Sequence, residues 1–255
     1  TELAVHGVKV SGVEFDVAQM QKRKTGILKA STSGIAMLLK SAGVTALQGH
    51  GKLLAARKVE FTAHDGKKET LSGKHLVLAS GSVPTELKSM PFEGKNIVDN
   101  WGALDFVAEP KKLAGVGAGL IGLELGSVWR RLGSEVVLLE ALDTFLAVAD
   151  QGLAKEAARH FKKQGLDIRL GAKVSAAKNT AAGVEVSYSD ANGEQKLTVD
   201  KLIVCVGRRP FTKDLLADGA GVKLDERGFI QVDDHCKTTA EDVWAVGDCV
   251  RGPML

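Results

Sequence analysis

A glycine pattern between residues 112 and 124 constrains the fold more than any other feature of this sequence. The segment KLAGVGAGLIGLE predicts a short buried strand, a tight turn, and a helix that begins near Leu120. Gly117, Gly119 and Gly122 have the G-x-G-x-x-G spacing. The first glycine allows the turn, the second lets a pyrophosphate approach the backbone, and the third lets helix and strand pack closely. Phosphates would then bind free N–H groups at the helix N-terminus.

The residues after this helix favour a dinucleotide-binding site over a βαβ unit whose glycine turn binds no nucleotide. Residues 134–140 (SEVVLLE) predict a second strand that ends at Glu140. Glu140 follows Gly122 at close to the ~20 residues expected of an acid that hydrogen-bonds a ribose 2′-hydroxyl. Ala141 and Leu142 come next, so no Lys or Arg stands there to receive a 2′-phosphate. This context favours NAD over NADP.

Composition excludes several classes of function. The 34 basic and 31 acidic residues leave a net charge of +3, and aromatic residues make up only 5%. Scattered charge with few aromatics argues against nucleic-acid binding. No apolar run approaches the ~20 residues that span a bilayer, so we expect no membrane partner. Cys205, Cys236 and Cys249 lack C-x-x-C spacing and the histidines lack metal-ligand spacing, which predicts no disulfide framework, no metal site and a cytoplasmic location.

The rest of the chain predicts further helices and strands of an α/β fold. Gly115 is unusual, because a β-branched residue packs better inside a strand. Residues 91–109 read as a connection, and Asp65-Gly66 predicts a hairpin turn. We expect helices over 13–41 and 151–164, strands over 44–48, 58–64, 67–71, 75–82, 166–170, 201–207 and 239–248, and a β-meander over 174–200. The expected architecture is a Rossmann-like domain with a parallel sheet, plus part of a second nucleotide-binding domain and a β-meander.

Four separated motifs occur in a fixed order along the chain. They are ASGSVP at 79–84, the glycine turn at 117–124, VGRRP at 206–210 and AVGD at 245–248. Together they resemble the flavin-dependent pyridine nucleotide-disulfide oxidoreductases, and within these the dihydrolipoamide dehydrogenases. The resemblance covers essentially the whole chain. It implies an FAD-binding domain in two parts, 1–108 and 236–255, with an NAD-binding domain at 109–235 between them.

The resemblance also implies roles for individual residues. Those implied to bind NAD are Gly117, Ala118, Gly119, Leu120, Ile121, Gly122, Leu123, Glu124, Glu140, Val174 and Gly207. Those implied to bind FAD are Gly51, Ser80, Gly81, Ser82, Asp248, Met254 and Leu255. Glu124 would face the nicotinamide, Glu140 the adenosine ribose, and Asp248 the ribityl chain of FAD. Arg208 and Arg209 read equally well as a surface pair and as a phosphate or ribose contact.

The family further has three features that this sequence lacks. They are a G-x-G-x-x-G motif for FAD, a redox disulfide with C-x-x-x-x-C spacing, and a dimerisation domain that supplies a His–Glu acid/base pair. The resemblance implies that a homodimer passes electrons from dihydrolipoamide, or from the lipoyl domain of a 2-oxo acid dehydrogenase complex, through FAD to NAD⁺. Without the reacting sulfurs we expect no catalytic residue in this chain and no lipoamide turnover by it alone. The alternatives are a reductase like mercuric or glutathione reductase, and a non-catalytic nucleotide-binding fragment.

Overall fold

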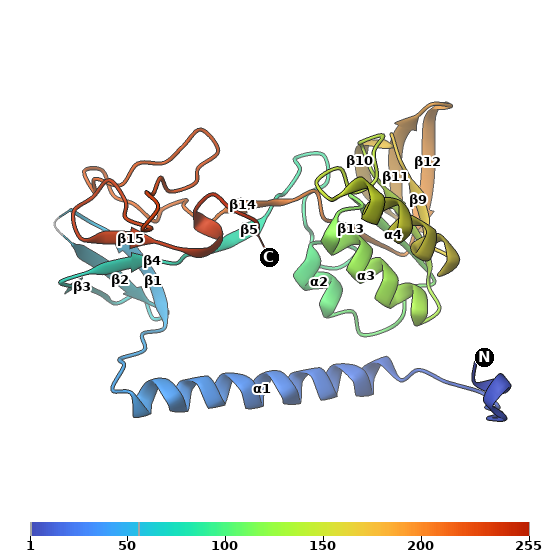
Figure 1. Cartoon of the computed structure of the whole chain (residues 1–255), viewed down its shortest axis with the longest axis horizontal. Helices are drawn as coiled ribbons and strands as arrows, with labels where there is room; N and C mark the ends of the chain where they lie inside the picture. Colours follow the sequence, from blue (N-terminus) through green and yellow to red (C-terminus); the bar gives the residue numbers. More distant parts are fainter. Residues whose placement is uncertain (1, 56, 255) are drawn as a thin grey trace. The chain divides into compact units, whose positions relative to one another are not determined.

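The computed structural model describes residues 2–55 and 57–254, and its contacts divide the chain into two units (Figure 1). The first unit comprises residues 1–35 and 88–204, and the second comprises residues 36–87 and 205–255. This division differs from the expected domain boundaries. Residues 1–35 and 88–108 join the unit that contains the glycine turn, and residues 205–235 join the other one.

The first unit is built on a five-stranded parallel sheet with the strand order β6-β13-β7-β8-β9. Strand β7 carries the glycine turn at its carboxyl end, and the chain then moves outward through β8 to β9. Strand β13 pairs with the opposite side of β7, so the strand order reverses at β7. Such a reversal opens a crevice at the carboxyl ends of the strands, where nucleotides bind in sheets of this kind. The strands are β6 (Ile97–Val98), β7 (Lys112–Val116), β8 (Glu135–Leu139), β9 (Asp167–Arg169) and β13 (Lys201–Val204).

The prediction that residues 91–109 form a plain connection is wrong. This segment contains β6 and the short helix α2 (Asn100–Leu104), whose N-cap Asp99 accepts a hydrogen bond from the Gly102 N–H. Ile97 and Val98 are both buried and pair with β13. Two apolar residues are too few to show a strand period in the sequence, and only the neighbouring strand makes them part of the sheet.

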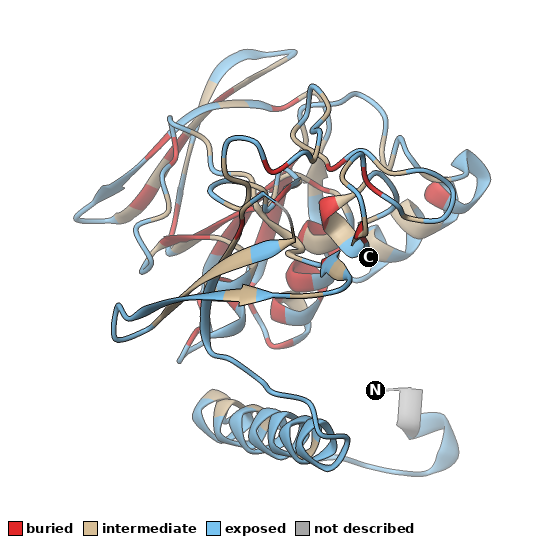
Figure 2. Cartoon of the chain, turned by 90° about the vertical axis from the view of Figure 1, so that its left-hand side faces the viewer, coloured by how far each residue is buried: buried red, intermediate tan, exposed pale blue. Residues whose placement is uncertain are grey.

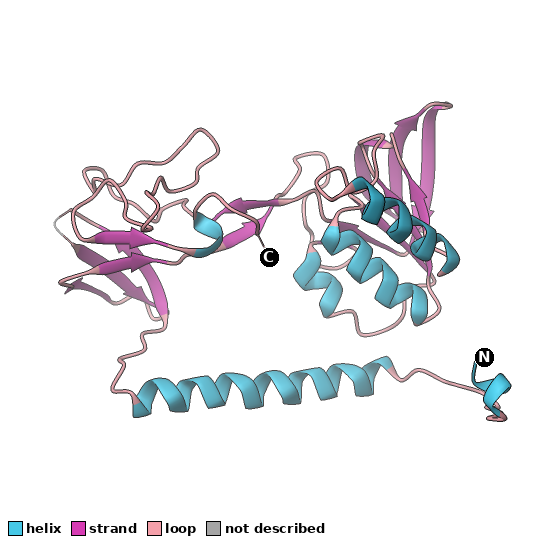
Figure 3. Cartoon of the chain, viewed as in Figure 1, coloured by secondary structure: helices cyan, strands magenta, loops and turns pink. Residues whose placement is uncertain are grey.

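Helices and an antiparallel group cover this sheet. Helices α2 and α3 (Leu120–Arg131) pack against β13, β7 and β8 (Figure 3). The antiparallel group packs against β7 and β13 and consists of β10 (Lys173–Thr180), β11 (Gly183–Asp190) and β12 (Gly193–Val199). The antiparallel group confirms the expected meander, with its second turn between Asp190 and Gly193. Helix α4 (Gln151–Lys163) is the second expected helix.

Gly115 is explained by its neighbour on β8. A Cβ atom added to Gly115 would lie 2.6 Å from Cδ2 of Leu138, which is 2% exposed. Gly126 of α3 also faces Leu138, because its added Cβ would lie 3.4 Å from the same atom. The Leu138 side chain therefore fills the space that a residue larger than glycine would need at 115. Buried residues gather in these strands and in α3 (Figure 2).

The second unit combines an antiparallel sheet with two short strand pairs. Leu53, Leu78, Ile230, Val243 and Cys249 belong to its core. The hairpin of β2 and β3 confirms the turn expected at Asp65-Gly66. The strands are β1 (Gly49–Leu53), β2 (Lys58–Ala63), β3 (Lys68–Ser72), β4 (Leu76–Leu78) parallel to β15 (Val243–Ala245), and β5 (Ser82–Pro84) antiparallel to β14 (Arg208–Pro210).

The strand expected over 44–48 is wrong, because pairing starts only at Gly49. Gly49 faces Ala63 in the register of β1 and β2, and an added Cβ would lie 2.3 Å from the Thr62 carbonyl oxygen. Val44 and Leu47 are half-exposed, at 50% and 44%. The apolar residues before Gly49 therefore have no strand partner to bury them.

The first long helix, α1 (Val17–Ser41), begins directly after its N-cap residue, Asp16. The carboxylate of Asp16 accepts a hydrogen bond from the Gln19 N–H at 2.9 Å, so Asp16 is the N-cap and the helix begins at the next residue, Val17. None of its residues is buried. Among the described residues, no helix has the length and apolar content needed to cross a membrane.

Candidate functional site

The glycine turn is shaped to receive an anion. It follows β7 at the point where the strand order reverses, and Gly117 has a φ of +98°, which side-chain-bearing residues rarely adopt. Gly119 is the N-cap of α3, and no side chain caps this helix. A Cβ added to Gly119 would meet no atom within 4 Å, so the space over the turn is open. The helix dipole favours a negative group in that space.

Glu140 lies against this turn. Its Oε2 atom accepts a hydrogen bond from the Ala118 N–H at 2.9 Å, and its Oε1 atom accepts one from the Leu142 N–H at 3.0 Å. The residue is half-buried. Each carboxylate oxygen has more than one lone pair, so both oxygens can still accept from a sugar hydroxyl. The structure therefore brings the expected ribose-binding acid to the expected phosphate-binding turn.

The loop that leads to Val174 is tied to the same region through backbone groups. The Gly171 N–H donates to the Leu142 carbonyl at 3.0 Å, and the Ala172 N–H donates to the Glu140 carbonyl at 2.8 Å. Val174 follows as a half-buried residue at the start of β10. These contacts support the prediction that Val174 lines the nucleotide groove, which no contact with a ligand tests.

Two of the residues expected to bind NAD are not joined to this cluster. Glu124 is exposed on α3 and makes no hydrogen bond or ion pair with the described residues. Its surroundings therefore agree equally well with a solvent-exposed glutamate that has no role in binding. Gly207 belongs to the second unit, where its carbonyl accepts a hydrogen bond from the Thr85 N–H at 3.0 Å. The roles implied for both residues stay predictions.

A second cradle lies at the carboxyl ends of β4 and β15. These strands are parallel neighbours, and the Val246 N–H donates to the Leu78 carbonyl at 3.0 Å, which places the two following loops together. Gly81 and Gly247 have φ values of +71° and +78°. The hydroxyl oxygen of Ser80 is buried and has no hydrogen-bond partner among the described residues. Because buried polar atoms in proteins are nearly always partnered, this hydroxyl fits a bound polar ligand.

The same cradle contains a chain of three hydrogen-bonded side chains. The Ser82 hydroxyl donates to Oδ2 of Asp248 at 2.6 Å. The Nε–H of Arg208 donates to the Ser82 hydroxyl oxygen at 2.7 Å, and its Nη2–H donates to the Ser82 carbonyl at 2.7 Å. The sequence alone did not show which of Arg208 and Arg209 has a structural or binding role. Side chains alternate along β14, so Arg208 is half-buried and Arg209 is exposed.

The remaining residues expected to bind FAD are spread through the second unit. Gly51 is half-buried on β1, and no hydrogen bond joins it to the loops after β4 and β15 within the described residues. Met254 is half-buried near the end of the chain. Leu255 lies outside the described residues. The structure therefore brings Ser80, Gly81, Ser82 and Asp248 together and leaves the others as predictions.

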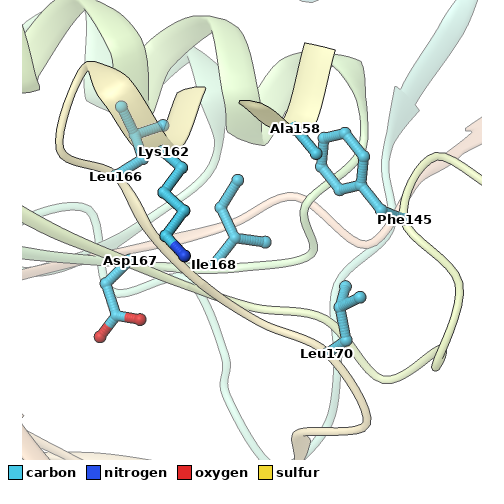
Figure 4. A pocket seen from close by; sticks show the side chains of 7 residues that line it. All are labelled: Phe145, Ala158, Lys162, Leu166, Asp167, Ile168 and Leu170. Carbon is cyan, nitrogen blue, oxygen red and sulfur yellow. The ribbon is translucent and has the colours of Figure 1, made fainter. Parts of the chain in front are cut away.

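Another hollow lies apart from the residues expected to bind a nucleotide. A cavity of about 360 Å³ lies between α4 and the edge strand β9 (Figure 4). None of the residues expected to bind a nucleotide lines it, so we do not place a cofactor there. Its lining residues are Phe145, Ala158, Lys162, Leu166, Asp167, Ile168 and Leu170.

No disulfide joins any of the three cysteines, all of which lie in the described part of the chain. Cys249 is fully buried, and its thiol donates weakly to the carbonyls of Leu78 and Val246 at 3.5 and 3.2 Å. This environment is that of a packed small hydrophobe rather than of a reactive thiolate. Within the described part of the chain, no group of three or more His, Cys, Asp or Glu side chains is arranged to hold a metal ion.

Comparison with known proteins decides the family. The family model described as pyridine nucleotide-disulphide oxidoreductase matches residues 5–255. The chain belongs to this family. It is 48% identical over 254 residues to the dihydrolipoyl dehydrogenase of Cupriavidus necator, which covers 99% of this chain and 53% of that protein. It is 36% identical to the mitochondrial dihydrolipoyl dehydrogenase of Sus scrofa over 258 residues, which covers 51% of that protein.

Solved structures of this oxidoreductase family share the fold. LpdA from Mycobacterium tuberculosis aligns with 93% of this chain at a TM-score of 0.85 and 25% identity, over 52% of its own length. The HOCl-induced flavoprotein disulfide reductase RclA from Escherichia coli aligns with 95% of the chain at a TM-score of 0.83 and 27% identity. The chain spans about half the length of the curated relatives it matches. The expected α/β fold and the resemblance to flavin disulfide oxidoreductases are confirmed.

Proposed function

We propose that this chain is the NAD-binding portion of a dihydrolipoyl dehydrogenase and supplies part of its FAD site. The whole protein would oxidise dihydrolipoamide, free or on the lipoyl domain of a 2-oxo acid dehydrogenase complex, and reduce NAD⁺. The observation that carries the proposal is the hydrogen bond from Ala118 to Glu140, because it joins the phosphate-binding turn to an acid fit for a ribose. The identity of 48% to a dihydrolipoyl dehydrogenase supports the substrate class.

The residues of the first unit would hold NAD and reject NADP. The Gly117 N–H donates to the Leu139 carbonyl and the Ala118 N–H donates to Glu140, so the N–H groups of the first turn of α3 would face the pyrophosphate. Glu140 would accept hydrogen bonds from the adenosine ribose. A 2′-phosphate would meet the Glu140 carboxylate. Arg169, on the neighbouring strand, already pairs with the carboxylate of Asp167 at 2.7 Å and donates to the Tyr188 hydroxyl at 2.6 Å, so its charge is largely balanced within the protein. Repulsion between the Glu140 carboxylate and a 2′-phosphate would disfavour NADP.

The residues of the second unit would hold part of FAD. The buried Ser80 hydroxyl would gain a hydrogen-bond partner, and Asp248 would accept from the ribityl chain. Bound FAD would carry two electrons between a dithiol and the nicotinamide. The protein would orient the flavin and exclude water from it. The domain boundaries at 108/109 and 235/236, the homodimer and the cytoplasmic location stay predictions.

Titration of the purified chain with NADH and with NADPH, followed by nucleotide fluorescence, tests the proposal. We expect NADH to bind at least about 10-fold more tightly, since charge repulsion at Glu140 acts only on the 2′-phosphate. A preference for NADPH would contradict the proposal and favour a reductase like glutathione or mercuric reductase. Flavin retained on purification would support it further, whereas NADH binding by a chain that takes up no FAD would favour a non-catalytic nucleotide-binding fragment.

A further inference from the structure

The Arg208 side chain donates two hydrogen bonds to Ser82. One bond reaches the hydroxyl oxygen and the other reaches the backbone carbonyl, each at 2.7 Å. The register of β5 and β14 makes this possible, because Arg208 faces Pro84 and Pro210 faces Ser82 on the paired strands. A guanidinium offers donors in a fixed planar fork, so this pair of hydrogen bonds sets the position of Ser82 more tightly than a single bond would.

This pair of hydrogen bonds also decides the direction of the Ser82 hydroxyl proton. A hydroxyl has one proton to donate, and a guanidinium nitrogen can only donate. Since the Arg208 Nε–H already donates to the Ser82 oxygen, the Ser82 proton must point elsewhere, and Oδ2 of Asp248 lies 2.6 Å away. The resulting series of hydrogen bonds runs in one direction from Arg208 through Ser82 to Asp248.

This series of hydrogen bonds uses only one of the two carboxylate oxygens of Asp248. No hydrogen bond joins Oδ1 of Asp248 to any of the described residues, and the residue is only half-buried. With Oδ2 fixed by Ser82, the carboxylate cannot rotate freely, so Oδ1 keeps one orientation. An oriented acceptor of this kind suits a sugar or polyol hydroxyl, which needs a partner at a definite position.

We propose that Arg208 is a positioning residue for the flavin-binding carboxylate of Asp248 and acts through the hydroxyl of Ser82. The inference rests on the proposed function for the assignment of Asp248 to the ribityl chain of FAD. It adds that Arg208 determines FAD affinity without touching the cofactor. Its neighbour Arg209 has no such role, because its side chain is exposed and makes no hydrogen bond or ion pair with the described residues.

A double-mutant cycle on the full chain tests this, with FAD affinity measured by flavin fluorescence titration. Arg208→Gln and Ser82→Ala should each weaken FAD binding by about 10-fold, the scale of a lost hydrogen bond to a charged group. If Arg208 and Ser82 act through the same series of hydrogen bonds, the FAD affinity of the double variant should also fall by only about 10-fold, because the second substitution removes nothing further. Arg209→Gln, the matched control, should bind FAD within about twofold of the unaltered chain.

Two further variants separate positioning from general support of the fold. Ser82→Thr keeps a hydroxyl and should restore most of the affinity that Ser82→Ala loses. Arg208→Lys keeps the charge but cannot make both bonds, so its affinity should fall between those of Arg and Gln at 208. Arg208→Lys also provides the test if the Gln variant does not fold. NADH affinity should stay unchanged in every variant, because none of the substituted residues is among those expected to bind NADH.

The outcomes distinguish this inference from the proposed function. Additive losses of about 100-fold in the double variant, or normal FAD affinity in Arg208→Gln, would overturn the role of Arg208 while leaving the flavin assignment intact. An equal loss for Arg209→Gln would overturn it as well. An unaltered chain that binds NADH but no FAD would instead contradict the flavin assignment, and this inference would fall with it.

Discussion

The Ala118 N–H donates to Oε2 of Glu140 across 2.9 Å, which links the turn after β7 to the end of β8. Two adjacent parallel strands therefore end in complementary halves of one site. Under the proposed function, the backbone of the turn would attract the pyrophosphate and the acid would repel a 2′-phosphate on the ribose. We therefore expect cofactor choice to depend on these two residues, which this hydrogen bond holds together.

Replacing Glu140 by Gln should weaken this selectivity. The single amide oxygen can accept from the Ala118 N–H or from the Leu142 N–H but cannot serve both as the carboxylate does. We expect NADH affinity to fall by about 10-fold and NADPH affinity to change much less, because the repulsive charge is gone. Fluorescence titration of both nucleotides measures this. Glu135→Gln, at an exposed position at the start of β8, is the control, and equal effects of the two substitutions would count against the role of Glu140.

Replacing Gly119 by Ala should separate binding from stability. The added Cβ would meet no protein atom within 4 Å, and the φ of Gly119 is −77°, which alanine adopts freely. The unfolding free energy should therefore fall by no more than about 1 kcal/mol, the cost of a poorer N-cap for α3. The methyl group would occupy the space for the pyrophosphate and lower NADH affinity by about 10-fold or more.

Gly34→Ala serves as the control for that experiment. Gly34 also has open space around it but lies on α1, where alanine should raise stability by about 0.5–1 kcal/mol and leave NADH binding unaltered. Urea unfolding and NADH titration measure the two quantities separately. Unchanged NADH affinity in Gly119→Ala would refute the placement of the pyrophosphate over this turn.

Replacing Gly115 by Ala should destabilise the first unit without changing the chemistry of the turn. The new Cβ would lie 2.6 Å from Cδ2 of Leu138, and relieving that overlap should cost about 1–2 kcal/mol of unfolding free energy. Gly126→Ala, whose Cβ would lie 3.3 Å or more from its neighbours, should cost less. Adding Leu138→Val should recover part of the loss in the Gly115 variant, as urea unfolding would measure. Fully additive effects would show that the two side chains do not compete for space.

Stability at acid pH should depend on Asp233. The N–H groups of Lys237 and His235 donate to its carboxylate at 2.9 Å and hold the pKa of Asp233 below its ordinary value of 3.8. A lowered folded-state pKa adds stability above pH 3.8, and this stability is lost as the pH falls through the folded-state value. Asp233→Asn should therefore lower the melting temperature at pH 7 and flatten its decline below pH 4. Asp234→Asn, at the neighbouring exposed position, should leave the melting curve as it is at both pH values.

Much of the fold was predictable because its signals are local. The hairpin at Asp65-Gly66, the meander that turns at Asp190 to Gly193, and the helix after Gly119 each follow from spacing within one short segment. The wrong predictions concern segments whose structure depends on a distant partner. Residues 97–98 become a strand only beside β13, and residues 44–48 fail to become one because no strand pairs with them.

By itself the sequence determined the glycine turn after the first strand of the nucleotide fold and the acid at the end of the next strand, because glycine spacing and strand length are properties of consecutive residues. It predicted that the turn binds a phosphate and that the acid binds a ribose. The tertiary structure alone decided that Glu140 lies on the Ala118 N–H, that residues 205–235 pack with the second unit, and that Arg208 rather than Arg209 holds Ser82. These are contacts between segments far apart in the chain. Their register is set by strand pairing and core packing, and no local pattern encodes it.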